Sequence, residues 1–176
     1  MKYVLSVLVK NEPGVLVRVA SMFGRRNFNI DSLAVGVTQH PDYSRMTVVV
    51  HGDESIVEQM IKQLEKLIEV VAVELLPQKS AVQRGMALLK VKADRDTKIE
   101  ILKMAEIFRA KVVDTSHDAF VFEVTGSDEK IDGFIEQLEV YGILETIRTG
   151  LISLERGSHT IYEKQKENDE NGKNVL

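Results

Sequence analysis

The hydrophobic pattern of the first 77 residues predicts strands and helices in the order β-α-β-β-α-β. Four segments are apolar or β-branched, as strands are, and turn residues separate the middle pair into a hairpin. These segments are residues 2–10, 30–38, 43–51 and 70–76. Between them, apolar residues recur at the spacing of a helix face. The two helical sets are Leu16, Val19, Ala20 and Phe23, and Val57, Ile61, Leu64 and Ile68 behind Asp53 as the N-cap.

The same order of elements repeats in the second half of the chain. Its strand-like segments are residues 85–93, 111–116, 119–125 and 143–154. Thr97 and Glu100 have the spacing of a capping box before one helix, Ser127 precedes the other, and Gly142 is the expected stop. The helical sets are Ile101, Ala105 and Phe108, and Ile131, Phe134, Ile135 and Leu138. Two tandem βαββαβ units predict an α+β fold with two ferredoxin-like domains.

Changes in composition suggest where the domains begin and end. Residues 1–77 form the first predicted domain, and the polar residues 78–84 are its linker to the second. Residues 85–157 form the second predicted domain. The tail, residues 158–176, is polar and dense in charge, so we expect it to be disordered.

Composition also excludes several classes of protein. The net charge of −4 gives no basic surface for nucleic acid, and only Tyr3 and Tyr43 lie near the central strands for stacking on RNA bases. The absence of cysteine excludes disulfides and thiolate chemistry. No apolar run approaches the roughly 20 residues of a membrane span, and the N-terminus lacks the layout of a signal peptide. We therefore expect a cytoplasmic protein without a membrane or nucleic-acid partner.

The sequence offers no pattern that indicates catalysis or metal binding. Its histidines, at positions 40, 51, 117 and 159, lack the spacing of metal ligands, so a surface role is expected for each. No nucleophile-elbow, phosphate-loop or dinucleotide-binding motif occurs. The carboxylates cluster on predicted helix faces, where solvent exposure explains them. We therefore expect no catalytic residue, no metal site and no cofactor bound by this chain itself.

The segment from Asn11 to Leu16 (NEPGVL) is the best candidate for a ligand site. It joins the first strand to a helix that we expect to begin near Pro13. Gly14 would let the backbone approach a ligand closely. The N–H groups of Gly14, Val15 and Leu16 would point outward at the positive end of the helix dipole, which suits a small carboxylate. The alternative is an ordinary strand-to-helix turn.

Two asparagines could complete such a site. Asn11 ends the first strand and Asn29 begins the second, so the two lie at opposite ends of the first helix in a βαββαβ unit. They could share a site only if two subunits pair across a sheet edge. Their amides could then orient an ammonium and a carboxylate beside an aliphatic wall of Val15, Leu16, Ile30 and Leu33. Both asparagines could equally be plain turn residues.

Three stretches of sequence resemble a known family. They are VKNEPGVLVRV at residues 9–19, RRNFNIDSL at residues 25–33, and SRMTVVV at residues 44–50. The first resembles the start of an ACT domain. Together they resemble the regulatory small subunit of acetolactate (acetohydroxyacid) synthase, and the resemblance extends over the whole chain to about Gly157.

This resemblance implies a regulatory subunit that is not an enzyme on its own. Its partner would be the catalytic large subunit, which carries thiamine diphosphate, Mg²⁺ and FAD and condenses pyruvate with a second 2-oxoacid. The small subunit would raise that activity and confer feedback inhibition by valine in branched-chain amino acid biosynthesis. ACT domains would pair in a homodimer with valine at the interface. The implied valine site comprises Asn11, Gly14, Val15 and Leu16 of one subunit, and Asn29 and Ile30 of the other, with Leu33 in the aliphatic wall.

Three other interpretations stay open from the residues alone. The chain could be an amino-acid sensor that controls transcription, although it has no basic face and would need another DNA-binding subunit. It could be an enzyme whose active site has no recognisable motif. It could also be a structural dimer with a vestigial pocket.

Overall fold

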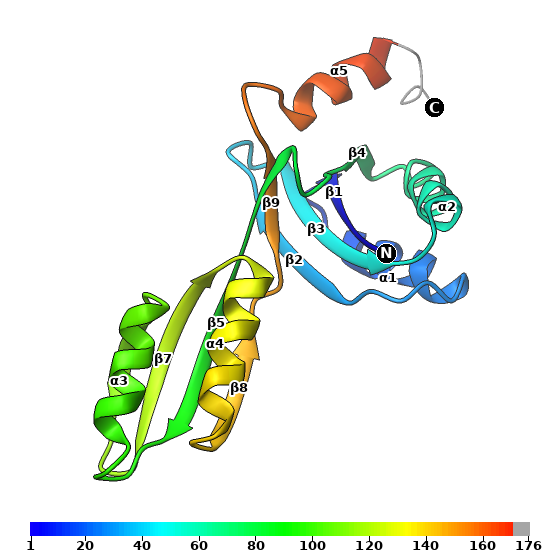
Figure 1. Cartoon of the computed structure of the whole chain (residues 1–176). Helices are drawn as coiled ribbons and strands as arrows, with labels where there is room; N and C mark the ends of the chain where they lie inside the picture. The colour runs from blue at the N-terminus through cyan, green and yellow to red at the C-terminus, as the bar shows by residue number, and fades with distance from the viewer. Residues whose placement is uncertain (171–176) are drawn as a thin grey trace. The chain divides into compact units, whose positions relative to one another are not determined.

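Two compact units make up the chain, each with its own sheet and helices (Figure 1). The computed structural model describes residues 1–170, and for residues 167–170 it describes the backbone only. One unit contains Met1–Val82 together with the chain from Ile152 onward, and the other contains Gln83–Leu151. The predicted α+β fold with two ferredoxin-like sheets is confirmed.

The sheet of the first unit is antiparallel, in the order β2-β3-β1-β4. Its elements are β1 (Lys2–Lys10), α1 (Val15–Arg25), β2 (Ser32–Val37), β3 (Tyr43–His51), α2 (Glu54–Leu64) and β4 (Val70–Leu75). Both faces of β1 are buried, as its continuous apolar sequence predicts. Asp53 occupies the N-cap position of α2 as predicted, although its side chain makes no capping hydrogen bond. The expectation that Ile68 belongs to the apolar face of α2 is wrong, because the helix ends at Leu64 and Ile68 is 76% exposed.

The helices cover one face of this sheet, and the C-terminal segment covers part of the other. Leu8, Val71 and Ala72 form a small apolar cluster there with Ile161, which is 2% exposed. Ile161 begins α5 (Ile161–Glu170), which packs on β4 (Figure 1). The structure therefore differs from the predicted disordered tail over residues 161–170, because Ile161 docks in an apolar cluster that composition does not reveal. Residues 171–176 of that predicted tail lie outside the described residues.

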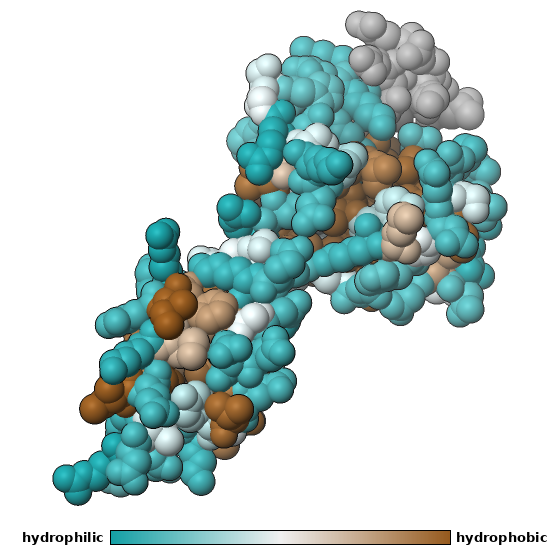
Figure 2. All heavy atoms as spheres, viewed as in Figure 1, coloured by the Kyte–Doolittle hydropathy of each residue, from teal (hydrophilic) through white to brown (hydrophobic). Residues whose placement is uncertain are grey.

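The sheet of the second unit runs in the order β6-β7-β5-β8. Its elements are β5 (Ala81–Lys92), α3 (Lys98–Ile107), β6 (Lys111–Thr115), β7 (Ala119–Gly126), α4 (Asp128–Glu139) and β8 (Ile143–Arg148). In its core the ring of Phe122 lies 5.7 Å from that of Phe120 and 5.8 Å from that of Phe134, both edge-on. In Figure 2 the apolar surface of this unit is divided into separate groups by hydrophilic residues.

Two predicted boundaries differ from the structure. The expected linker at residues 78–84 already contains the start of β5 at Ala81. The expected last strand at residues 143–154 is divided into β8 and β9 (Ile152–Glu155). Gly150 separates them with a φ of +79°, a conformation that interrupts an extended strand. As a result β9 belongs to the first unit, so the chain returns there after completing the second.

The helix starts of the second unit follow the sequence signals in part. Ser127 caps α4 as predicted, with its Oγ accepting the N–H of Lys130 at 3.4 Å. The predicted capping box at Thr97 is wrong, because Thr97 already has helical torsion angles. Asp94 supplies the acceptor instead, and its Oδ1 takes the N–H groups of Thr97 at 2.9 Å and Asp96 at 3.1 Å.

Candidate functional site

Asn11 connects the end of β1 to the turn between β2 and β3. Its Nδ2 donates to the Pro41 carbonyl at 2.8 Å, and its Oδ1 accepts from Ser44 Oγ at 3.0 Å. Its backbone N–H donates to the Asp42 carbonyl at 2.7 Å. The turn role that the sequence left open is therefore present. The same hydrogen bonds fix the orientation of the Asn11 amide, although the residue is exposed to solvent.

Gly14 precedes α1 in a backbone conformation that favours glycine. Its φ is +86°, and a Cβ at this position would meet no heavy atom within 4 Å. The helix begins at Val15, slightly later than expected, and no side chain caps it. The Val15 N–H donates to the Glu12 carbonyl over a long 3.4 Å. Within one chain, the space beside the positive end of α1 is therefore open to a carboxylate.

The aliphatic residues of the predicted site differ in burial. Val15 is 4% exposed and belongs to the core, so its side chain is not available to a ligand. Leu16 is 44% exposed. Ile30 and Leu33 are partly buried and pack against the same core. The core of the domain therefore holds Ile30 and Leu33 in place, whereas Leu16 exposes apolar surface to solvent.

Asn29 lies at the opposite end of α1 from Asn11. Its Nδ2 donates to Asp31 Oδ1 at 2.6 Å, and Asp31 forms an ion pair with His51 at the end of β3. Asn11, in contrast, contacts Ser44 at the beginning of β3. The seven residue steps between these positions on β3 correspond to roughly 23 Å at about 3.3 Å per residue. One chain therefore does not bring the two asparagines together, in agreement with the topological argument.

Exposed apolar residues lie on β2 and on the neighbouring helix. On β2, Val35 is 46% and Val37 is 62% exposed, and on α1 the values are 44% for Leu16 and 67% for Val17. Within the described residues β2 pairs only with β3, so it forms an edge of the sheet. An edge strand with apolar neighbours is suited to pairing with another chain.

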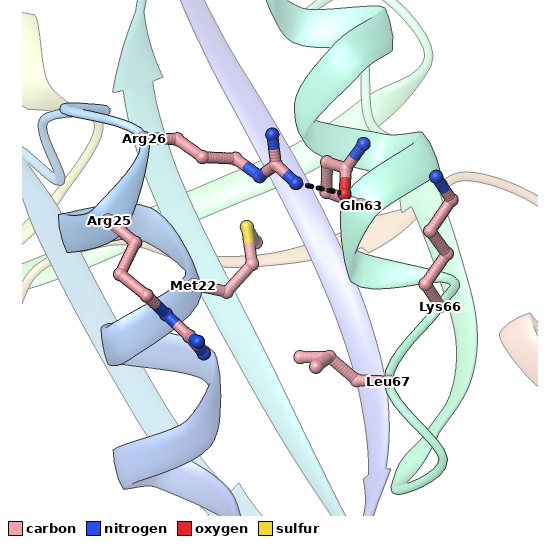
Figure 3. A pocket seen from close by; sticks show the side chains of 6 residues that line it. All are labelled: Met22, Arg25, Arg26, Gln63, Lys66 and Leu67. Carbon is pink, nitrogen blue, oxygen red and sulfur yellow. Dashed lines mark hydrogen bonds between the residues drawn. The ribbon is translucent and has the colours of Figure 1, made fainter.

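A hollow of about 370 Å³ lies between α1 and α2 (Figure 3). Its lining residues are Met22, Arg25, Arg26, Gln63, Lys66 and Leu67. Arg26 Nη2 donates to Gln63 Oε1 at 2.7 Å. The described lining holds three cationic side chains and no carboxylate, so its charge suits an anion. None of the residues predicted for valine lines it. The only sequence signal for it was that Arg25 and Arg26 fall outside the apolar stripe of α1.

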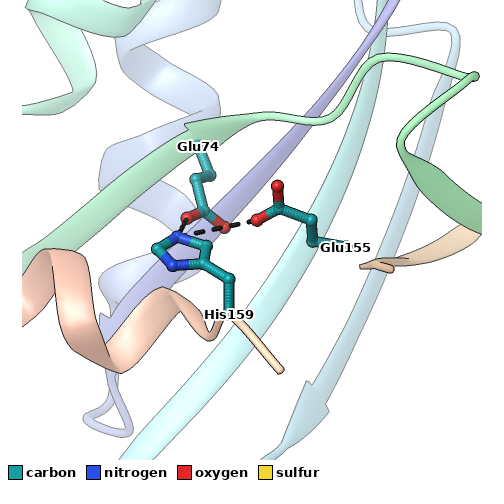
Figure 4. A group of neighbouring side chains, drawn as sticks. All are labelled: Glu74, Glu155 and His159. Atoms are coloured by element: carbon teal, nitrogen blue, oxygen red, sulfur yellow. Dashed lines mark hydrogen bonds and ion pairs between the residues drawn. The ribbon is translucent and has the colours of Figure 1, made fainter. Parts of the chain in front are cut away.

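Acidic side chains form a cluster around His159 that no sequence pattern indicates. His159 is exposed, as a surface role requires. Its ring contacts Glu74 and Glu155 (Figure 4), and it also contacts Glu163. The Glu74 carboxylate, which is 8% exposed overall, and the neighbouring carboxylates raise the pKa of His159. No spacing in the sequence relates Glu74 to His159, because only the return of the chain to the first unit brings them together.

Comparison with known proteins identifies the family. A family profile described as an AHAS small subunit-like ACT domain matches residues 5–72, and one described as the small subunit of acetolactate synthase matches residues 84–157. A probable acetolactate synthase small subunit of Archaeoglobus fulgidus is 49% identical over 158 residues, which is 90% of this chain and 99% of the relative. The chain belongs to the acetolactate synthase small-subunit family.

Other members of the small-subunit family support this assignment. The small subunit of Mycolicibacterium smegmatis is 47% identical over 159 residues, 90% of this chain and 94% of the relative. The crystal structure of the small subunit from Thermotoga maritima is similar with a TM-score of 0.84 at 40% identity, covering 90% of this chain and 99% of that one.

Family membership confirms the resemblance seen in the sequence. The chain is a regulatory, non-catalytic small subunit in branched-chain amino acid biosynthesis, which implies the catalytic large subunit as its partner. Among the described residues, no helix combines the length and apolar character needed to cross a membrane. The small-subunit profile ends at residue 157, so His159 and α5 lie outside it.

Proposed function

We propose that this small subunit activates the catalytic large subunit and confers feedback inhibition by valine, which binds between two paired ACT domains. Thiamine diphosphate, Mg²⁺ and FAD belong to the large subunit in this proposal, and both subunits act in the cytoplasm. The position of β2 at the sheet edge carries the argument. Antiparallel pairing of two β2 edges brings the start of β2 in one chain beside the end of β2 in the other. The Asn29 end of one chain then lies near the Asn11 end of its partner.

The polar groups at these two ends match the charges of an α-amino acid. The N–H groups of Val15 and Leu16 face the ligand carboxylate, and Gly14 leaves room for it. A side-chain amide has two N–H donors and two acceptor lone pairs. Asn11 uses one donor and one acceptor on the turn, so it retains one of each for an ammonium or a carboxylate. Asn29 uses one donor on Asp31 and keeps its carbonyl oxygen for the ammonium.

The isopropyl group of valine rests on Ile30 and Leu33, which the core of the domain holds in place. Burial of an aliphatic side chain of this size contributes about 1.5–3 kcal/mol. One additional methylene changes such binding by only about 10- to 200-fold, so leucine and isoleucine are weaker competitors rather than excluded ligands. Inhibition further requires that valine bind one arrangement of the subunits more tightly than another.

Complementation between two variants tests whether the site is shared by two chains. Asn11→Ala and Asn29→Ala should each abolish valine binding measured by isothermal titration, while circular dichroism shows an unchanged fold. In a mixed dimer, one site carries both substitutions and the other carries neither. Dissociating, mixing and reassociating equal amounts should therefore restore about one quarter of the valine sites, since half of the dimers are mixed.

Two results would contradict the proposal. Differently tagged chains show whether mixed dimers have formed. If they have formed and no valine site is restored, the site lies within one chain. Full valine binding by either single variant would remove that asparagine from the site. Activation is measured separately, as the rise in acetolactate formation when wild-type chain is added to the large subunit without valine.

A further inference from the structure

The imidazole of His159 faces two carboxylates with spacing that suits a bound metal ion (Figure 4). Its Nε2 lies 3.1 Å from Glu74 Oε1 and 3.5 Å from Glu155 Oε2. Glu74 comes from β4, Glu155 from β9, and His159 from the segment before α5. Zinc binds imidazole and carboxylate ligands at about 2.0–2.2 Å in tetrahedral geometry, which separates neighbouring ligand atoms by about 3.3–3.6 Å. The two separations from Nε2 lie at or close to this range, and the three ligand atoms all lie within 4.8 Å of one another.

The second ring nitrogen of His159 has the partner that metal-binding histidines usually have. Its Nδ1 lies 2.7 Å from Glu163 Oε2, one turn further along the chain. A histidine that binds a metal almost always donates its other ring N–H to a carboxylate or carbonyl, which fixes the tautomer and the direction of the ring. When a metal ion displaces the proton from Nε2, the proton that Nδ1 shares with Glu163 would hold the ring with Nε2 facing the ion, Glu74 and Glu155.

A buried hydroxyl on the same strand gives an independent indication of a ligand. Ser153 is 4% exposed, and its Oγ has no hydrogen-bond partner among the described residues. Buried hydroxyl groups are rarely left without a partner. Ser153 and Glu155 are two residues apart on β9 and therefore point to the same face of the strand. A ligand bound on this face of β9 would give the hydroxyl a partner.

The charged groups around His159 are mostly anionic. Three carboxylates, those of Glu74, Glu155 and Glu163, surround the ring. Arg45 acts on Glu74, and its Nε donates to Ser6 Oγ at 2.8 Å. Lys164 follows Glu163, and its Nζ donates to the carbonyl of Val73, next to Glu74. The three carboxylates outnumber these two cations, which suits a bound cation.

We propose that Glu74, Glu155 and His159 bind a divalent transition-metal ion, with Glu163 orienting the imidazole. The ion fastens the C-terminal segment to the face of the ACT-domain sheet that α5 covers. Zinc suits this donor set best, because imidazole nitrogen favours Zn²⁺ whereas Mg²⁺ and Ca²⁺ prefer oxygen ligands. The site uses residues beyond the family profile, and it is separate from the residues proposed for valine.

Titration of chelator-treated full-length chain with ZnCl₂ tests this site directly. We expect saturable binding of one ion per chain by calorimetry, and intense visible absorption bands of tetrahedral Co²⁺ when CoCl₂ replaces zinc. Glu155→Gln and His159→Gln should abolish both signals. Glu163→Gln should weaken zinc affinity by about 10- to 100-fold, as changes in residues that orient a ligand do. His117→Gln, which removes an exposed histidine from the turn between β6 and β7, is the matched control and should bind zinc as wild type does.

Limited proteolysis supplies a second readout, and its main comparison, with and without zinc, uses the wild-type chain alone. Zinc should slow cleavage of the wild-type chain after residue 157 and should have no such effect on Glu155→Gln. Absence of saturable binding overturns the proposal, as does binding that Glu155→Gln leaves intact or that His117→Gln removes. Equal binding of MgCl₂ would overturn the assignment to a transition metal. Cleavage that zinc leaves unchanged would overturn the fastening role.

Discussion

Gly14→Asp is the substitution that tests the proposed valine carboxylate site most directly. Gly14 has a φ of +86°, and a Cβ there would meet no heavy atom within 4 Å, so the new side chain fits within one chain. It would enter the space where the proposed ligand carboxylate lies. Gly14→Asn is the matched control, because asparagine has the same shape, carries no charge, and tolerates the left-handed region about as well as aspartate does.

The magnitude follows from the repulsion between two carboxylates. At about 4 Å, two like unit charges repel by about 1 kcal/mol in bulk water and by about 4 kcal/mol at an effective dielectric constant of about 20. A site between two domains lies between these limits. Gly14→Asp should therefore bind valine about 5- to 1000-fold more weakly than Gly14→Asn, at about 1.4 kcal/mol for each factor of ten.

Two measurements check this prediction. Isothermal titration gives the valine affinity of both variants, and the reconstituted enzyme gives the valine concentration that halves activity. Activation without valine should be the same for both, because the substitution changes only the charge beside the ligand. If Gly14→Asn loses as much valine affinity as Gly14→Asp, backbone strain and not charge is responsible. If Gly14→Asp remains fully sensitive to valine, the carboxylate binds elsewhere.

Three further predictions concern the fold. Phe122→Ala should lower the free energy of unfolding of the second unit, measured in urea, by about 3–5 kcal/mol, because it removes a fully buried ring from the centre of that core. A loss below about 1 kcal/mol would contradict this packing. Ile161→Asp should detach α5, seen as faster amide exchange over residues 161–166 with unchanged exchange in β1, whereas retained protection would show that Ile161 does not hold the helix. Hydrogen bonds from Thr97 lower the pKa of Asp94, so their stabilisation of α3 is fully present above about pH 4 and is lost as pH falls through the lowered pKa. Amide exchange at Thr97 should therefore speed up over that pH range in the wild-type chain. In Asp94→Asn the exchange should not change with pH, apart from the change in the intrinsic exchange rate.

The strands of the first unit were predictable because local pattern and tertiary environment agree. Residues 2–10 and 43–51 form strands over the same residues as predicted, since both segments are apolar and lie at the centre of the sheet. The repeated order of elements was sufficient to predict two ferredoxin-like sheets. Helix starts were less predictable, because several acceptors compete for the first N–H groups. Asp94 replaces Thr97 at α3 for this reason.

The C-terminal segment could not be predicted from pattern, because its contacts are tertiary. Glu74 and His159 are 85 positions apart, and no periodicity relates them. The polar composition of residues 158–176 predicts disorder. Docking of α5 depends instead on one buried isoleucine, Ile161, and on the sheet face that it helps to cover. The hollow lined by Arg25, Arg26 and Lys66 was missed for a similar reason, since it forms where two helices meet.

The proposed valine site has a different relation to the fold. Asn11 and Asn29 each satisfy part of their hydrogen-bonding capacity inside one chain. The groups left over lie at opposite ends of the same sheet, and in the proposed site they would converge only in a pair of chains. Ligand binding is then coupled to pairing rather than to folding of the monomer. By linkage, valine must tighten the dimer by the same factor by which pairing raises valine affinity. Feedback inhibition can therefore act through the arrangement of subunits while each ACT domain keeps the same internal structure.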